Sequence, residues 1–165
     1  MSEKKELLTD KATGLPLGQI IGLADLNEIH PTEAIAPHGI SATELAFGDY
    51  SPRRWAWEFE AHITLVDPIE CKGMLGLWKI PDDIADRIEA QFLERITNAL
   101  SLTQPYASLV TAGEKAFETR SWKTAMRGFI AIHAASTFPK DCRQLCFKEP
   151  FASALERIKR DLEAV

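Results

Sequence analysis

The sequence predicts a single α+β domain built on a small, strongly curved β-sheet. The chain has 165 residues, which is typical of one domain, and 45% of them are hydrophobic, enough for a buried core. Strand patterns outnumber helix patterns along the chain. Loops join the expected strands more often than helices do, which argues against a doubly wound parallel sheet.

The first half of the chain contains three expected strands. Residues 19–26 form an apolar run that is typical of a buried strand. Residues 55–66 alternate between apolar and mostly polar side chains, and the dipeptide at 67–68, Asp-Pro, is expected to end or kink this strand. A shorter strand is expected near 74–80. The stretch 27–41 is expected to be a long loop, a length that favours a functional role.

The second half adds helices to the sheet. Isoleucine and phenylalanine recur every four residues over 82–96, which predicts a helix with Asp82 as its N-cap. A brief second helix is expected to start with Pro105 in its first turn and to end at Gly113. The remaining expected elements are strands at 116–120 and 128–135 and a last helix from about Pro150.

Composition and cysteine usage restrict the functions to consider. The net charge is -5, which disfavours nucleic-acid binding driven by many phosphate contacts. No apolar run is long enough for a membrane span, and the N-terminus lacks a signal-peptide pattern. Cys71, Cys142 and Cys146 are interpreted as reduced thiols of a cytoplasmic protein. Because only His133 could complete a site at the last two, we expect no metal, and no motif indicates a cofactor.

The charge is unevenly distributed along the chain. Residues 1–96 hold 9 basic and 17 acidic residues, whereas residues 97–165 hold 10 basic and 7 acidic residues. The net charge of the whole chain argues against binding along an extended stretch of nucleic-acid duplex. It is compatible with one small cleft in which three basic residues contact a single nucleotide.

The densest polar cluster lies between Gly113 and Arg120. Strand alternation predicts that Lys115 and Thr119 share one face while Glu118 and Arg120 share the other. A lysine at such a helix-to-strand corner can point into a cleft and serve as a base or a nucleophile. The alternative is a solvated edge strand with a Glu–Arg pair of little energetic weight.

Two further clusters have spacings that suit nucleic acid. Arg53 and Arg54 precede Trp55 and Trp57, a pattern that suits a stacked base and its phosphate. The alternative is that both tryptophans belong to the core. Lys72 opens a Lys-Gly-Met-Leu-Gly stretch similar to GxxG loops that hold a nucleotide backbone, although most such spacings are ordinary turns.

Two stretches of the chain resemble the ASCH domain family. The first runs Gln104-Pro105-Tyr106-Ala107, Gly113-Glu-Lys115-x-x-Glu118-x-Arg120-Ser121-Trp122 and Arg127-Gly128-x-Ile130-x-Ile132-His133-Ala134. The second includes Leu15-Pro16-x-Gly18, Glu44-x-x-Phe47-Gly48-Asp49-Tyr50, Arg54-Trp55-Ala56-Trp57 and Lys72-Gly73-x-x-Gly76-Leu77-Trp78. The resemblance implies a PUA-like fold over residues 1–165, which is a small β-barrel with flanking helices.

The order of the two stretches departs from the family. Residues 15–80 resemble the C-terminal half of an ASCH domain, residues 97–140 resemble its N-terminal half, and 82–96 is the joining helix. This order resembles a circular permutation. It predicts that strand 128–135 lies near strand 19–26 and that the chain ends are neighbours in a monomer. A domain-swapped homodimer is the alternative.

The family resemblance also implies a function. ASCH domains are similar to modules that bind RNA or modified nucleosides, and some members are amidohydrolases of N4-acetylcytidine or ribonucleases. The implied cleft is lined by Lys115, Glu118, Arg120, Glu44, Tyr50, Arg54 and Trp55, with Lys72 as a further ligand contact. In the amidohydrolases a Lys, a Thr and a Glu carry the chemistry. Lys115 matches the Lys, Glu118 stands at the Thr position, and Glu44 is the candidate for the Glu.

Three functions therefore stay open. The first is a binding module for RNA or a nucleoside, with no membrane partner. The second is a small hydrolase that uses Lys115 with Glu44 or Glu118. The third is a protein-interaction or regulatory domain without a nucleotide site. Lys115 and Arg120 pointing into open solvent, with Glu44 remote from both, would favour the third.

Overall fold

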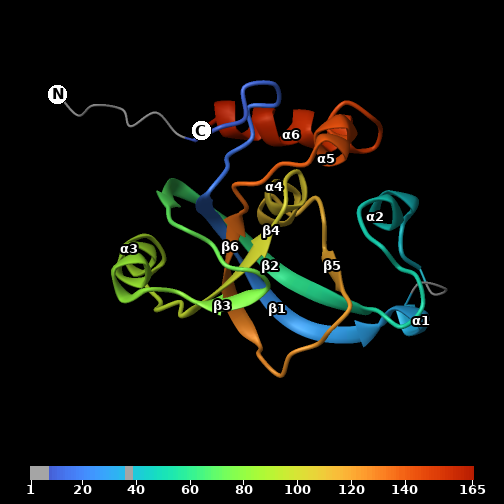
Figure 1. Ribbon diagram of the computed structural model, residues 1–165, viewed down its shortest axis with the longest axis horizontal. Coiled ribbons are helices and arrows are strands. Elements are labelled where there is room, and N and C mark those ends of the chain that lie inside the picture. Colours follow the sequence, from blue (N-terminus) through green and yellow to red (C-terminus); the bar gives the residue numbers. More distant parts are fainter. Residues whose placement is uncertain (1–7, 36–38) are drawn as a thin grey trace.

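The protein folds into one six-stranded sheet that curls into a half-barrel, with helices around it (Figure 1). The computed structural model describes residues 8–35 and 39–165. The strands are β1 (Gln19–Pro31), β2 (Trp55–Glu70), β3 (Leu77–Lys79), β4 (Asn98–Leu102), β5 (Phe117–Arg120) and β6 (Gly128–Ala134). The helices are α1 (Thr32–Ile35), α2 (Ala42–Ala46), α3 (Asp82–Phe92), α4 (Tyr106–Thr111), α5 (Lys140–Leu145) and α6 (Phe151–Glu163). The predicted α+β class with a curved sheet is confirmed.

The centre of the sheet joins segments that are far apart in the sequence. The strand order is β3-β4-β6-β1-β2-β5, and among these strands β4 and β6 run parallel while the other neighbouring pairs are antiparallel. Strand β1 pairs with β6 from Gln19 opposite Ala134 to Leu26 opposite Gly128. This pairing confirms the prediction that strand 128–135 lies beside strand 19–26.

Both long strands continue beyond their predicted ends. Strand β1 extends through residues 27–31, which were expected to be a loop, because these residues pair with the start of β2. Helix α1 follows, and residues 36–38 of the expected loop lie outside the described residues. The dipeptide 67–68 does not end β2. Two steps along β1, from Ile20 to Gly22, oppose five along β2, so Pro68 falls where the register shifts and no regular ladder bond is required.

The segment that connects β3 to α4 along the chain also differs from the prediction. Helix α3 ends at Phe92 rather than Ile96, because Leu93 adopts a left-handed conformation with φ 66° and turns the chain. Its N-cap is Pro81, which provides no side-chain cap, instead of Asp82. The expected helix is followed by a strand that was not predicted, β4, which lies between β3 and β6.

Gln104 links the two family-like stretches just before α4. Its side chain is fully buried and its Nε2 donates to the carbonyl of Pro16 at 2.9 Å and to Ser108 Oγ at 2.8 Å. Its Oε1 accepts from the Ser108 amide at 3.1 Å. One amide side chain therefore caps α4 and ties it to the segment that enters β1. Pro105 is the N-cap residue of α4 rather than part of its first turn.

The C-terminal helices cover one end of the half-barrel, next to the first described residues (Figure 1). Arg143 in α5 pairs with Asp10 at 2.9 Å, and Leu15 packs in the same core cluster as Phe151 and Leu155 of α6. The chain start itself, residues 1–7, lies outside the described residues, so the prediction of neighbouring chain ends stays a prediction. No helix among the described residues is long and apolar enough to cross a membrane.

Candidate functional site

The turn between α4 and β5 positions Lys115. Gly113 ends the helix with φ 76°, a left-handed conformation that favours glycine, and β5 begins only at Phe117. Lys115 therefore precedes the strand, and the predicted alternation, which placed it on the face opposite Glu118, is wrong. Its Nζ turns back to donate to the carbonyl of Phe117 and lies 3.4 Å from Glu118 Oε2.

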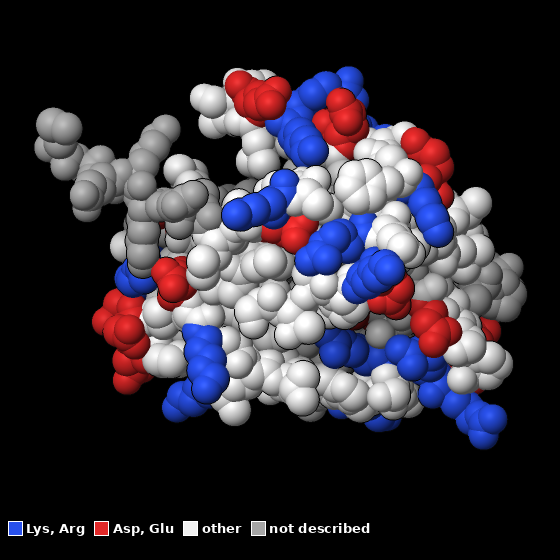
Figure 2. Space-filling model, turned by 45° about the horizontal axis from the view of Figure 1, so that its top comes forward, with Lys and Arg blue, Asp and Glu red and all other residues white. Residues whose placement is uncertain are grey.

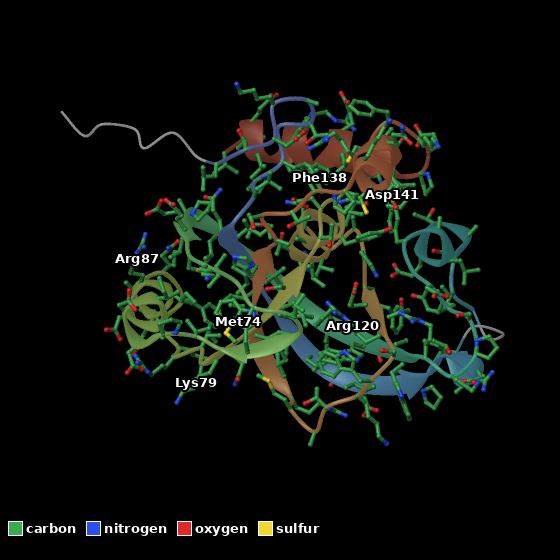
Figure 3. The ribbon with its side chains drawn as sticks, in the orientation of Figure 1. Met74, Lys79, Arg87, Arg120, Phe138 and Asp141 are labelled. Atoms are coloured by element: carbon green, nitrogen blue, oxygen red, sulfur yellow. The ribbon has the colours of Figure 1, made fainter. Side chains whose placement is uncertain are left out.

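Lys115, Glu118 and Arg120 form a chain of alternating charges. The Lys115 side chain is 1% exposed and that of Glu118 is 14% exposed. The other oxygen of Glu118 lies 3.3 Å from Arg120 Nε, and Arg120 Nη2 donates to the carbonyl of Ser101 at 3.0 Å. Figure 3 shows Arg120 in the space between β5 and β4. One carboxylate thus lies between two cations at the open edge of the half-barrel.

Glu44 fixes the backbone of the same turn from α2. Its two carboxylate oxygens accept from the amides of Ala116 at 3.1 Å and Phe117 at 3.0 Å. The Ser41 side chain accepts from the Glu44 amide at 3.1 Å and so begins the helix that carries it. Charge-assisted bonds to two successive amides make Glu44 a positioning residue for the segment that holds Lys115.

Tyr50 supplies a buried hydroxyl close to the carboxylates. Its Oη has no hydrogen-bond partner among the described residues. Burial raises the pKa of this phenol, and the negative charges of Glu44 and Glu118 raise it further. The hydroxyl therefore stays protonated near these two carboxylates.

Arg54 is engaged with the protein itself. Its Nε donates to the carbonyl of Asp49 at 3.1 Å and its Nη2 donates to the carbonyl of Thr119 at 3.3 Å. The Asp49 amide in turn donates to Thr119 Oγ1 at 3.0 Å. These contacts bind the loop before β2 to strand β5.

The two tryptophans of β2 differ in their burial. Trp57 is fully buried, contacts Trp122 edge to face at 4.8 Å and donates from Nε1 to the Trp122 carbonyl. Trp55 is partly buried against the same cluster, and Lys123 Nζ lies 4.5 Å from its ring centre. Trp55 is opposite Arg120 in the pairing of β2 with β5. Trp57 is therefore a core residue, whereas Trp55 is only partly buried against the core.

A cavity of about 340 Å³ opens beside this cluster. It is lined by Ala46, Phe47, Gly48, Asp49, Tyr106, Glu118 and Thr119. Glu118 is the predicted site residue among them. The sequence interpretation missed Asp49, Tyr106 and Thr119, although each stands inside a motif quoted for the family resemblance.

Gly48 lines this cavity and packs closely against Tyr50 and Thr119. A Cβ atom there would lie 2.9 Å from Tyr50 Cε2 and 3.3 Å from Thr119 Oγ1. The close approach explains why the smallest residue stands next to Asp49.

Lys72 lies at a different cavity, of about 670 Å³, together with Ser101 and His133. The structure therefore groups seven of the eight predicted site residues around one turn and strand, and separates the eighth from them. Ser101 connects the two groups of residues. Its carbonyl accepts from Arg120, and the residue also lines the larger cavity.

His133 is a buried histidine with both ring nitrogens engaged. Nε2 lies 3.0 Å from the carbonyl of Cys71, and Nδ1 lies 3.2 Å from Ser101 Oγ. Because a carbonyl only accepts, Nε2 carries the proton of the neutral ring and Ser101 donates to Nδ1. Trp78 Nε1 completes the network by donating to Ser101 Oγ at 3.0 Å.

We expect stability to decrease on acidification because of His133. Burial lowers its pKa below the ordinary 6.5. The unfolded chain therefore takes up a proton first, so the free energy of unfolding falls as the pH drops from about 6.5 towards the lower folded pKa. Urea unfolding followed between pH 7 and pH 5 measures this. The pH-dependent decrease is expected to be smaller in His133→Gln, and equal slopes for the two proteins would contradict it.

Lys115 and Arg120 do not point into open solvent, and Glu44 is not remote, so the geometry disfavours a domain without a site. The face shown in Figure 2 carries basic side chains interspersed with acidic ones rather than one broad basic surface. This distribution fits a small site better than an extended electrostatic track.

Comparison with known proteins gives one family match. The model described as ASCH domain matches residues 100–159, which run from β4 to α6. No curated protein and no solved structure matches the chain.

Proposed function

We propose that the 340 Å³ cavity at Glu118 binds one nucleotide of an RNA or a modified nucleoside, in a chain whose residues 100–159 match the ASCH domain model. The family assignment suggests RNA binding or a related function in general. The observation that carries the finer proposal is a carboxylate held between two cations at the wall of a cavity that also contains an aromatic ring.

The lining chemistry favours the base of a nucleotide. The cavity volume lies within the range of about 300–1,000 Å³ that is usual for small-ligand sites. Carboxylates such as that of Glu118 accept from the amino group of a base, and a ring such as that of Tyr106 offers a stacking surface. The Thr119 hydroxyl provides an additional polar atom.

The cations of the cluster act mainly within the protein. Lys115 is buried against Glu118, and the donors of Arg54 bind two carbonyls. Glu118 and Asp49 would repel a phosphate placed in the cavity itself. In this proposal Lys115, Arg54 and Glu44 are positioning residues, and Trp55, already covered by Lys123, lies outside the base pocket.

The test is a calorimetric titration of cytidine and of a short single-stranded RNA at low salt. We expect Glu118→Gln, which keeps the side-chain shape, to weaken both affinities by about 10- to 100-fold, the usual worth of a good contact to a base edge. Glu89→Gln on the exposed face of α3 is the matched control and should bind like wild type. Equal affinities for wild type and Glu118→Gln, or no binding by the folded wild type, would overturn the proposal.

A hydrolase is the second candidate, favoured by the buried contact between Lys115 and the cavity residue Glu118. Both oxygens of Glu44 are held by backbone amides, so Glu118 is the better placed group for proton transfer. The titration repeated with N4-acetylcytidine separates the two functions. Release of acetate by wild type and not by Lys115→Ala supports the hydrolase, and equal behaviour of both removes this role for Lys115.

A further inference from the structure

The largest cavity described above, of about 670 Å³, has no role in the proposed base site. It lies between the loop 71–76, which connects β2 to β3, and residues at the ends of β4 and β6. The residues that matter for its chemistry are Lys72, Gly73, Ser101, His133, Ser136 and Thr137.

The loop is held in place by His133 and by backbone bonds at its two ends. The imidazole donates to the Cys71 carbonyl. The Cys71 amide donates to the carbonyl of Gly18, and the Gly76 carbonyl accepts from the Ser101 amide of β4. Gly73 packs directly on the ring, because a Cβ atom at this position would overlap the imidazole. The loop is thus preorganised without using the amides of residues 73–75.

The cavity wall is rich in hydrogen-bond donors. The amides of Gly73, Met74 and Leu75 donate no hydrogen bond to any residue within 8–35 and 39–165. Lys72 has no ion pair with a residue of those two ranges, and Ser136 and Thr137 add hydroxyl groups to the opposite wall. Free amides, hydroxyls and an ammonium together are a donor set that suits phosphate oxygens.

The same wall also contains one acidic residue. Glu70 lines the cavity, and it already has an interaction within the protein.

Arg120 separates this cavity from the base site. Its Nε lies 3.3 Å from Glu118, which lines the smaller cavity, and its Nη2 bonds the carbonyl of Ser101, which lines the larger one. Arg120 Nε is buried and has no aligned hydrogen-bond acceptor among the described residues. Arg120 therefore contacts one lining residue of each cavity.

We propose that the larger cavity receives the phosphate next to the nucleotide whose base binds at Glu118. The ligand is then a single-stranded oligonucleotide of at least two nucleotides rather than a free nucleoside. This inference rests on the proposed function. Lys72 and the loop amides bind the phosphate, and Arg120 lies beneath the connecting backbone.

The test compares cytidine, its 3′- and 5′-monophosphates and the dinucleotide CpC in titrations at several salt concentrations. Wild type should bind CpC more tightly than cytidine. Lys72→Ala should lose this gain and lower the salt slope by about 0.7, the value for one phosphate contact on a single strand, while cytidine binding is unchanged. Lys79→Ala on β3, an exposed lysine labelled in Figure 3, is the charge-matched control and should behave like wild type.

The outcomes separate the two proposals. Equal affinities of wild type for cytidine and CpC, or an equal effect of Lys72→Ala and Lys79→Ala, would overturn the phosphate site and leave the base site intact. Tighter binding of one monophosphate than of cytidine supports the phosphate site and identifies the direction of the strand. If Glu118→Gln leaves cytidine affinity unchanged, the base site fails instead.

Discussion

Glu118→Ala is expected to lower the free energy of unfolding by about 3–5 kcal/mol, because it leaves the buried Lys115 ammonium without its counter-charge. Lys115 is 1% exposed and, within the described part of the chain, would retain only the Phe117 carbonyl as a partner. Arg120 loses the same carboxylate. Urea denaturation followed by tryptophan fluorescence measures the loss. Glu89→Ala, which removes an exposed carboxylate paired with Arg95, should stay close to wild type.

A double variant separates the charge effect from a general packing defect. Replacing the pair by apolar residues, Lys115→Met with Glu118→Leu, removes both charges and should recover most of the lost stability. It should not recover ligand binding, because the acceptor of the base is gone. Glu118→Ala with wild-type stability would mean that the pair is solvated, as the edge-strand interpretation of this cluster requires.

Gly113→Ala is expected to cost stability and ligand affinity together. The left-handed φ of 76° adds about 1–2 kcal/mol for a residue with a Cβ atom. The new methyl group would also overlap the ring of His62, an exposed side chain that has to move to make room. Since Gly113 ends α4 two residues before Lys115, the shift would move the buried charge chain.

Gly14→Ala provides the matched control for this prediction. Gly14 has nearly the same φ, 74°, but no atom of the described residues lies within 4 Å of the position its Cβ would take. Denaturation of both variants therefore separates the backbone cost from the contact with His62. Equal losses would show that the His62 ring moves aside freely, and unchanged ligand affinity in Gly113→Ala would contradict the role of this turn.

The long strands could be predicted because their patterns are strong. The apolar run at 19–26 and the alternation at 55–66 each specify a strand without reference to the rest of the chain. Strand β4 could not be predicted in this way. Its sequence Asn-Ala-Leu-Ser-Leu has little strand propensity, and its conformation depends on β3 and β6 at either side.

The candidate site was predicted as a set of residues but not as a geometry. The Gly-x-Lys-x-x-Glu-x-Arg spacing identified Lys115, Glu118 and Arg120, which do contact one another. Their arrangement depends on where β5 starts, and a strand boundary is the least predictable feature of a pattern. Tyr106 and Asp49 reach the cavity from two other segments, which only the fold brings together.

The circular permutation that the order of the two family-like stretches indicates stays a prediction. Strands from both family-like stretches share one sheet, and β1 joins β6 across more than a hundred residues. This pairing is what a permuted monomer requires. A domain-swapped dimer would use the same pairing between two chains.

A crystal structure of the protein with a bound cytidine-containing dinucleotide tests the central claim most directly. The account predicts a base in the cavity between Tyr106 and Thr119, with its amino group within hydrogen-bond distance of Glu118. A base bound elsewhere on the protein, with this cavity empty, would contradict it.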